Sequence, residues 1–478
     1  MPHDNRHLLP DMTKKMLNKK AWLIALIALT LVTAGCRREQ PALPAPGAAE
    51  VQPQDIPPAT EAIDTAIKEN EEPPAEPVPL LTPETFALKS APANVQVFLN
   101  DELINPVSAT PDAGLRHFEI TMTGMLSFRA AGYRPIEHHS AALPVRGGIV
   151  GIKLELANGL LQLRGEYRTG VQPKSAFFSP DGQRVFLPLL GQHGIDVFRR
   201  TEDSLEFERR LSVPGSNSAG FVEALLDARR REVWVSNMEK NSVHIFDLDT
   251  LEYKISVSTG GVFPKVIAQS PDGNLTAVSN WVSRDVSIFD PDTRELLRRI
   301  PVGGIPRGLA FSSDGSLLYT AIFDEPLVAV IDMAQNRITS RFRLYEGQGA
   351  ARHIVYRNGR LYVSDMLRGT VNILNASTGA LLHSRRIGPN INTIVLSPNG
   401  RYVFAASRGR NSPQGYLWPG PDFGAVFMLR AEDLSLVERV WGRNQPTGLD
   451  ISPDGRMLVF TDFLDNNLQL YLLPDFRY

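Results

Sequence analysis

Short apolar runs separated by turn-forming residues recur from about residue 159 to residue 478. In one unit, "KVIAQ" (265–269) enters the turn "SPDG" (270–273), and "TAVSN" (276–280), "DVSIFD" (285–290) and the more polar "ELLRRIPV" (295–302) follow. Runs of this length between Gly and Pro residues are typical of β-strands. Pro at the second and Gly at the fourth turn position match a type I turn. The unit therefore predicts four strands, with the last strand at the outer edge of the sheet.

This unit occurs seven times. Its aligned turns are anchored at Ser179, Asp227, Ser270, Ser312, Arg357, Ser397 and Ser452. Their spacing of about 40 to 55 residues is typical of four-stranded propeller blades. The seventh unit lacks a fourth strand, and "GLLQLRGEYRTG" (159–170) precedes the first unit like an orphan outer strand. We therefore predict an all-β protein with a seven-bladed β-propeller over residues 158–478, in which an N-terminal strand closes the last blade.

The strand sequences "VWVSN" (233–237), "AVSN" (277–280) and "LYVSD" (361–365) resemble the core of the YVTN-type β-propeller repeat. The tails "VHIFD" (243–247) and "VSIFD" (286–290) match the third strand of that repeat. The resemblance implies the seven-bladed fold. It leaves function open, because that fold supports binding scaffolds, lactonases and cofactor-dependent enzymes.

Residues 91–157 have a different pattern, with apolar residues at every second position in "VQVFLND" (95–101), "LRHFEITMTG" (115–124) and "GIVGIKLEL" (148–156). This alternation predicts strands with one buried face and hence a small β-sandwich. The order of strands and turns resembles bacterial PEGA-like modules. His138 and His139 are adjacent, so in a strand they point to opposite faces, which predicts no metal site there.

The N-terminal region predicts export. A basic stretch and about fourteen apolar residues (21–34) precede small residues and Cys36, which is the layout of a signal peptide. The segment resembles a bacterial lipobox, which implies acylation of Cys36 and, with Arg37 next to it, the outer membrane of the cell envelope. Residues 1–36 form this predicted leader, with Met1, Met12 or Met16 as its start. An ordinary secreted protein and a single membrane anchor are the alternatives.

Residues 37–90 are rich in Pro, Ala and Glu and predict a tether without a packed core.

The composition of the whole chain limits which partners and cofactors are expected. The net charge is −2, which predicts no nucleic-acid partner. Cys36 is the chain's one cysteine, so no internal disulfide is expected. The sequence contains no "CxxCH", "GxSxG" or "HExxH", and we predict no cofactor and no metal.

The residues that could bind a ligand or catalyse a reaction are predicted at one mouth of the propeller channel. The first strand of each blade begins at the mouth where the second ends, because the two are antiparallel. Near the start of the first strands the aligned residues are Lys174, Val222, Lys265, Arg307, Arg352, Asn392 and Thr447. At the ends of the second strands they are Leu189, Asn237, Asn280, Ile322, Asp365, Ser407 and Asp462. The four cations predict a funnel for an anionic ligand or an acidic peptide; alternatively, they pair with Asp365 and Asp462.

The sixth unit adds a long loop, residues 407–424, at the same mouth. Its Arg408, Tyr416 and Trp418 belong to residue types enriched in interface hot spots. The loop predicts a contact surface for a protein partner, or else a cap that buries Trp418 against its own blade.

The sequence is compatible with two functions, one in binding and one in catalysis. The first is a lipid-anchored envelope protein whose propeller binds or scaffolds a protein or an anionic ligand at the channel mouth. The second is a hydrolase or lactonase, with His353 or Asp365 as base and Arg307 and Arg352 stabilising an oxyanion. The absence of a catalytic motif favours the first.

Overall fold

The computed structural model describes residues 84–475 except 112, 113, 121 and 147. Apart from short 3₁₀ turns such as Ser140–Ala142, the regular elements of these residues are β-strands. No helix within this part of the chain is long and apolar enough to cross a membrane. The predicted leader with Cys36, and the tether up to residue 83, lie outside the described residues.

The first nine strands form two packed sheets, which confirms the predicted sandwich. One sheet has the order β4-β5-β1-β9-β8 and the other β3-β2-β6-β7. Their shared core includes Leu88, Val97, Phe118, Phe128 and Val150. The strands are β1 (Glu84–Ala91), β2 (Gln96–Leu99), β3 (Glu102–Ile104), β4 (Ser108–Thr110), β5 (Leu115–Ile120), β6 (Met125–Arg129), β7 (Ile136–His139), β8 (Val145–Arg146) and β9 (Ile149–Lys153).

The sandwich begins earlier than the sequence suggested. Strand β1 starts at Glu84, within the range 37–90 that was predicted as tether. Phe86 and Leu88 are buried at alternate positions, and β1 pairs antiparallel with β5 and parallel with β9. The alternation spans too few residues to stand out beside the Pro- and Glu-rich stretch that precedes it.

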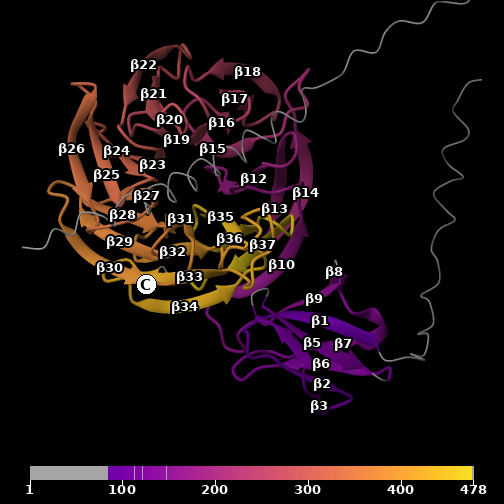
Figure 1. The fold of residues 1–478 in the computed structure, drawn as a ribbon. Coiled ribbons are helices and arrows are strands. Elements are labelled where there is room, and N and C mark those ends of the chain that lie inside the picture. Colours follow the sequence, from indigo (N-terminus) through magenta and orange to yellow (C-terminus); the bar gives the residue numbers. More distant parts are fainter. Residues whose placement is uncertain (1–83, 112–113, 121, 147, 476–478) are drawn as a thin grey trace, which may run out of the picture. The chain divides into compact units, whose positions relative to one another are not determined.

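Seven four-stranded sheets follow (Figure 1), which confirms the predicted propeller. The first four blades are β11 (Phe177–Phe178), β12 (Arg184–Pro188), β13 (Ile195–Thr201) and β14 (Ser204–Leu211); β15 (Phe221–Asp227), β16 (Glu232–Asn237), β17 (Ser242–Asp247) and β18 (Tyr253–Ser258); β19 (Pro264–Gln269), β20 (Thr276–Asn280), β21 (Asp285–Phe289) and β22 (Leu296–Pro301); and β23 (Pro306–Phe311), β24 (Leu317–Ile322), β25 (Leu327–Asp332) and β26 (Arg337–Arg343).

The remaining blades are β27 (Ala351–Arg357), β28 (Arg360–Asp365), β29 (Thr370–Asn375) and β30 (Leu381–Arg386); β31 (Ile391–Leu396), β32 (Tyr402–Ser407), β33 (Ala425–Arg430) and β34 (Leu436–Trp441); and β35 (Pro446–Ile451), β36 (Met457–Asp462) and β37 (Asn467–Leu472) with β10 (Gln162–Arg168) as outer strand. Strand β10 pairs antiparallel with β37. The ring is therefore closed by the strand that the sequence identified.

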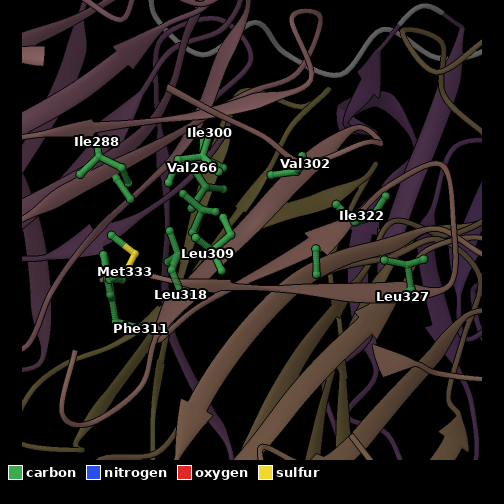
Figure 2. Packing of buried hydrophobic residues seen from close by; sticks show 14 residues of the cluster. Val266, Ile288, Ile300, Val302, Leu309, Phe311, Leu318, Ile322, Leu327 and Met333 are labelled. Atoms are coloured by element: carbon green, nitrogen blue, oxygen red, sulfur yellow. The ribbon is translucent and has the colours of Figure 1, made fainter. Parts of the chain in front are cut away.

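The hydrophobic cores lie between neighbouring blades. Figure 2 shows one of them, in which Val266, Ile288 and Ile300 of the third blade pack against Leu309 and Leu318 of the fourth. Inner blade strands are covered on both faces, so all six residues of β16 are buried. The outer strand β26 faces solvent: five of its residues are exposed, and the other two are partly buried. These two patterns explain why only the last strand of each unit is polar in sequence.

The "SPDG" turns have a shared structural role at the mouth opposite the predicted funnel. The Ser270 hydroxyl donates to Asp272 at 2.5 Å and accepts the Leu275 amide at 2.9 Å. The Gly273 amide donates to the Ser270 carbonyl at 2.8 Å, and Gly273 has φ +72°. A positive φ favours glycine. The repeated motif thus builds the hairpin between the first two strands.

Candidate functional site

The candidate site is built on an irregularity at the start of the inner strands. In six of the seven blades the register between first and second strand shifts there, as between Pro264 and Ile267 and between Ala351 and Ile354. The two residues inside each shift include Lys265, Arg307 and Arg352. A β-bulge re-aims side chains out of the regular ladder. Six of the seven positions that the sequence aligned as a ring are therefore bulge residues on the strands nearest the channel, and the seventh, Lys174, precedes β11.

A hydroxyl group on the second strand fixes several of these bulges. The Ser279 hydroxyl accepts the amide of Val266 in its own blade at 3.1 Å and donates to the carbonyl of Arg307 in the next blade at 2.9 Å. Ser236 makes the corresponding bonds to Glu223 and Lys265. We call these residues bridging serines. They explain the Ser in the repeated "VSN": it joins neighbouring blades at the site.

The structure brings the four predicted cations together and adds a fifth. Burial and like charge hold the pKa of Lys174 well below its usual value, and the charges that act on it come from Arg408, Arg352, Arg307 and Lys265. The residues Arg307, Arg352 and Arg408 are 3%, 5% and 5% exposed. These five residues form what we call the cationic lumen.

One carboxylate enters this cluster, and the sequence analysis did not select it. Arg307 Nη2 lies 3.1 Å from Glu223 Oε1, and Glu223 is 8% exposed. Within the described residues, no ion pair links Lys174, Lys265, Arg352 or Arg408 to a carboxylate. The lumen therefore carries an excess of positive charge. The available signal was an acidic residue inside the apolar run that makes up most of the strand "FVEALLD".

Several buried polar groups in the lumen have no partner in the described part of the chain. The guanidinium of Arg352 makes no hydrogen bond or ion pair there. Arg307 Nη1, Arg408 Nε, His353 Nδ1 and both amide atoms of Asn392 are likewise unpartnered. Asn392 is 0% exposed. Buried polar and charged groups are normally hydrogen-bonded, because desolvation without compensation is costly. This arrangement suits an oxyanion.

Aromatic side chains hold the two lysines. Lys174 Nζ lies 4.6 Å from the centre of the Phe463 ring. Lys265 Nζ lies 5.3 Å from the Phe263 ring and 5.8 Å from the Trp281 ring. Cation–π contacts of this kind stabilise a charge without neutralising it. Burial and the neighbouring cations lower the pKa of both lysines well below its usual value, so an anion bound beside them would favour their protonated form.

The sixth-blade loop is connected to the lumen. Arg408 donates to Gln445 Oε1, and Gln445 Nε2 donates to the Tyr416 carbonyl at 2.6 Å. The Tyr416 ring lies 5.5 Å from the Arg408 guanidinium and stacks on Phe463 at 6.5 Å. Trp418 is 56% exposed, so the loop does not bury it against its own blade.

The five polar residues aligned at the ends of the second strands form local contacts instead, and Ser407 donates to the Pro389 carbonyl at 2.6 Å. Asn237 accepts the amides of Glu239 and Lys240, and Asn280 donates to Asp285 and Ser287. Asp462 accepts from the Arg443 amide at 2.8 Å and from Gln469 at 2.6 Å. Asp365 and Asp462 make no ion pair with the lumen cations. The alternative in which they neutralise those cations is therefore wrong.

The two candidate bases differ. Asp365 accepts from the amides of Ala350 and Arg368 and from the Tyr345 hydroxyl, so both of its oxygens are engaged. His353 is partly exposed, with Nδ1 unpartnered. Burial, Arg352 and Arg307 lower the pKa of His353 to about 3, which keeps the imidazole neutral and makes it a weak base at neutral pH.

Comparisons with known proteins agree with this fold. The model of the YNCE-like beta-propeller family matches residues 150–317, and that of the 7-bladed beta-propeller lactonases matches residues 327–474. A solved chain of hydrazine synthase from Kuenenia stuttgartiensis has a TM-score of 0.53 and 19% identity, over 64% of this chain and 96% of that chain. At this identity the likeness shows the fold alone.

The protein is thus a seven-bladed β-propeller protein with a cationic lumen. It belongs to the family of the antigen Lp49 of Leptospira interrogans, to which it is 36% identical over 317 residues, covering 64% of this chain and 68% of that protein. Protein NirF of Stutzerimonas stutzeri is 28% identical over 156 residues, which are 31% of this chain and 37% of NirF. The chain spans well under two thirds of NirF.

Proposed function

We propose that the propeller is a binding module whose cationic lumen takes an anionic group of a ligand or partner. The observation that carries this proposal is the cluster of buried arginines: Arg352, 5% exposed, makes no side-chain hydrogen bond or ion pair among the described residues, and Arg307 Nη1 and Arg408 Nε are buried and unpartnered there. An arginine buried without an anion costs several kcal/mol, and its planar fork fits carboxylate or phosphate. An oxyanion between Arg352, Arg307 and Asn392 offsets that cost.

Anion-dependent stability tests the proposal. The thermal midpoint of the wild type is measured against inorganic phosphate at constant ionic strength, with chloride as the balancing anion. A site filled at about 100 times its Kd stabilises the protein by about 2.7 kcal/mol. Arg352→Gln should abolish the phosphate dependence and raise the midpoint without phosphate. Arg385→Gln, on the fully exposed strand β30, is the matched control. Equal phosphate shifts in all three proteins would refute the site.

We further propose that the protein is anchored in the cell envelope through an acylated Cys36, at the outer membrane, with residues 37–83 as tether and a PEGA-like sandwich before the propeller. The lipobox-like sequence and the Pro-rich composition support this assignment. Cys36→Ala should move the protein from the membrane fraction to the soluble fraction and abolish incorporation of labelled palmitate. Unchanged fractionation would contradict the anchor.

The alternative function is hydrolysis of a lactone at the same lumen. The match of residues 327–474 to the lactonase family model favours it. His353 is then the base and Arg307 and Arg352 stabilise the oxyanion. Turnover of aliphatic and aromatic lactones by the wild type, lost in His353→Gln with phosphate binding retained, would establish catalysis. No turnover by the wild type leaves binding as the function.

A further inference from the structure

Exposed apolar side chains surround the lumen. They lie in the loops that precede the inner strands or follow the second strands, which open at the same mouth. We call them the apolar rim: Val171 (41% exposed), Val262 (39%), Val282 (55%), Leu367 (61%), Tyr416 (37%), Leu417 (47%) and Trp418 (56%).

The rim is confined to one mouth. The other large, exposed apolar residues described for the propeller lie on outer strands or just before β10: Leu160, Phe207, Ile255, Leu297, Leu381, Leu382 and Leu436. In the described loops at the opposite mouth, which contain the "SPDG" turns, no large apolar residue is exposed. Exposed apolar patches of this kind mark interaction sites.

The rim and the lumen form one surface. Val262 precedes Phe263 and Val282 follows Trp281, the two aromatic residues that flank Lys265. Trp281 in turn contacts Phe323 of the next blade, with ring centres 4.6 Å apart. Across the mouth, Tyr416 lies over Arg408 and leads directly into Leu417 and Trp418. A recessed cationic centre is thus surrounded by an apolar border.

We infer that the occupant of this mouth is a protein segment that inserts an acidic side chain into the lumen and lays flanking apolar side chains on the rim. This inference rests on the proposed function. A small anion fills the lumen but leaves the rim exposed. An anionic membrane is a flat surface, and its headgroups do not reach arginine residues that are only 3% to 5% exposed. A projecting acidic residue between apolar neighbours complements both parts.

Three capped heptapeptides test the inference by fluorescence anisotropy. The first has the core Phe-Glu-Phe between Gly-Ser and Ser-Gly ends, the second replaces Glu by Gln, and the third replaces both Phe residues by Ser. We expect the wild type to bind the first peptide roughly tenfold or more tightly than either of the others, because a charged hydrogen-bonded group and buried aromatic rings each contribute on this scale.

Two variants separate the parts of the site. Arg352→Gln should remove the preference for Glu over Gln and keep the preference for Phe over Ser. The double variant Leu417→Ser, Trp418→Ser should do the opposite. Leu436→Ser, which changes an equally exposed residue (47%) on β34, should retain both preferences.

The outcomes distinguish the two proposals. Phosphate stabilisation and a Glu preference without any Phe preference would overturn the protein-segment inference and leave the anion site in place. Loss of both preferences and of phosphate stabilisation would overturn both proposals. Sedimentation with phosphatidylcholine vesicles containing phosphatidylglycerol, abolished by the double rim variant, would identify a membrane as occupant and also overturn the inference.

Discussion

Ser279→Ala tests whether the bridging serines hold the lumen together. Ser279 lies in β20 of the third blade and is 0% exposed. Its hydroxyl accepts the amide of Val266 at 3.1 Å and donates to the carbonyl of Arg307 at 2.9 Å. Both backbone groups belong to bulge residues that pair with no strand at that point. The substitution therefore removes the partner of a buried donor and of a buried acceptor.

The expected loss follows from those two groups. Leaving one buried polar group unsatisfied costs about 1 to 3 kcal/mol, and the small cavity left by one oxygen adds little. We expect Ser279→Ala to lower the free energy of unfolding by about 2 to 6 kcal/mol, the sum for the two groups. Because Arg307 loses the contact that fixes its carbonyl, phosphate binding in the lumen should weaken as well.

Urea unfolding followed by tryptophan fluorescence measures the first effect, and the phosphate titration measures the second. Ser340→Ala is the matched control, because Ser340 is exposed on the outer strand β26, where such changes alter stability by about 0.5 kcal/mol or less. The fourth blade naturally has Ala321 at the corresponding position. A loss below about 0.5 kcal/mol in Ser279→Ala would refute the bridging role.

Three further predictions concern charge. Glu223→Gln should lower stability by about 3 kcal/mol, as expected when a buried ion pair loses one partner, and should tighten phosphate binding; unchanged phosphate affinity would contradict its role as counter-charge. Burial raises the pKa of Asp450 to about 7, so the folded state keeps a proton that the unfolded state releases above its lower pKa. The stabilisation from this proton is complete below about pH 4 and is lost as the pH rises through about 7. Over that range the free energy of unfolding of the wild type should fall by about 1.4 kcal/mol per pH unit. Urea unfolding of Asp450→Asn should not show this fall. The His353 imidazole, with its pKa of about 3, should show no NMR titration between pH 5 and 8, and a midpoint near 6.5 would contradict its position beside Arg352 and Arg307.

The repeat architecture was predictable because it is specified locally. Apolar runs, "SPDG" turns and a polar fourth strand repeat in each blade, so seven blades and the closing strand can be read without tertiary information. The strand β1 was missed because Phe86 and Leu88 supply only two alternations next to a Pro-rich stretch. A packed partner sheet, rather than the local pattern, defines that strand.

The lumen was predictable only in part. Aligning one residue per blade found Lys174, Lys265, Arg307 and Arg352. Each bulge, however, contains two residues, and in the second blade the second of them is Glu223. The residues at the ends of the second strands were misread as lumen residues. Asp365 and Asp462 accept backbone amides of neighbouring loops, and a sequence pattern does not show which amides lack a partner.

Closure of the last blade by β10 makes the order of the blades along the chain circular. Strands β10 and β37 are neighbours in one sheet although they stand at the two ends of the propeller sequence. A partial chain therefore leaves an open sheet edge, which is prone to pairing with other molecules. The ring closes only once its last strand has been made. It also follows that a circular permutant, with residues 159–170 moved behind β37, would contain seven contiguous blades and the same lumen.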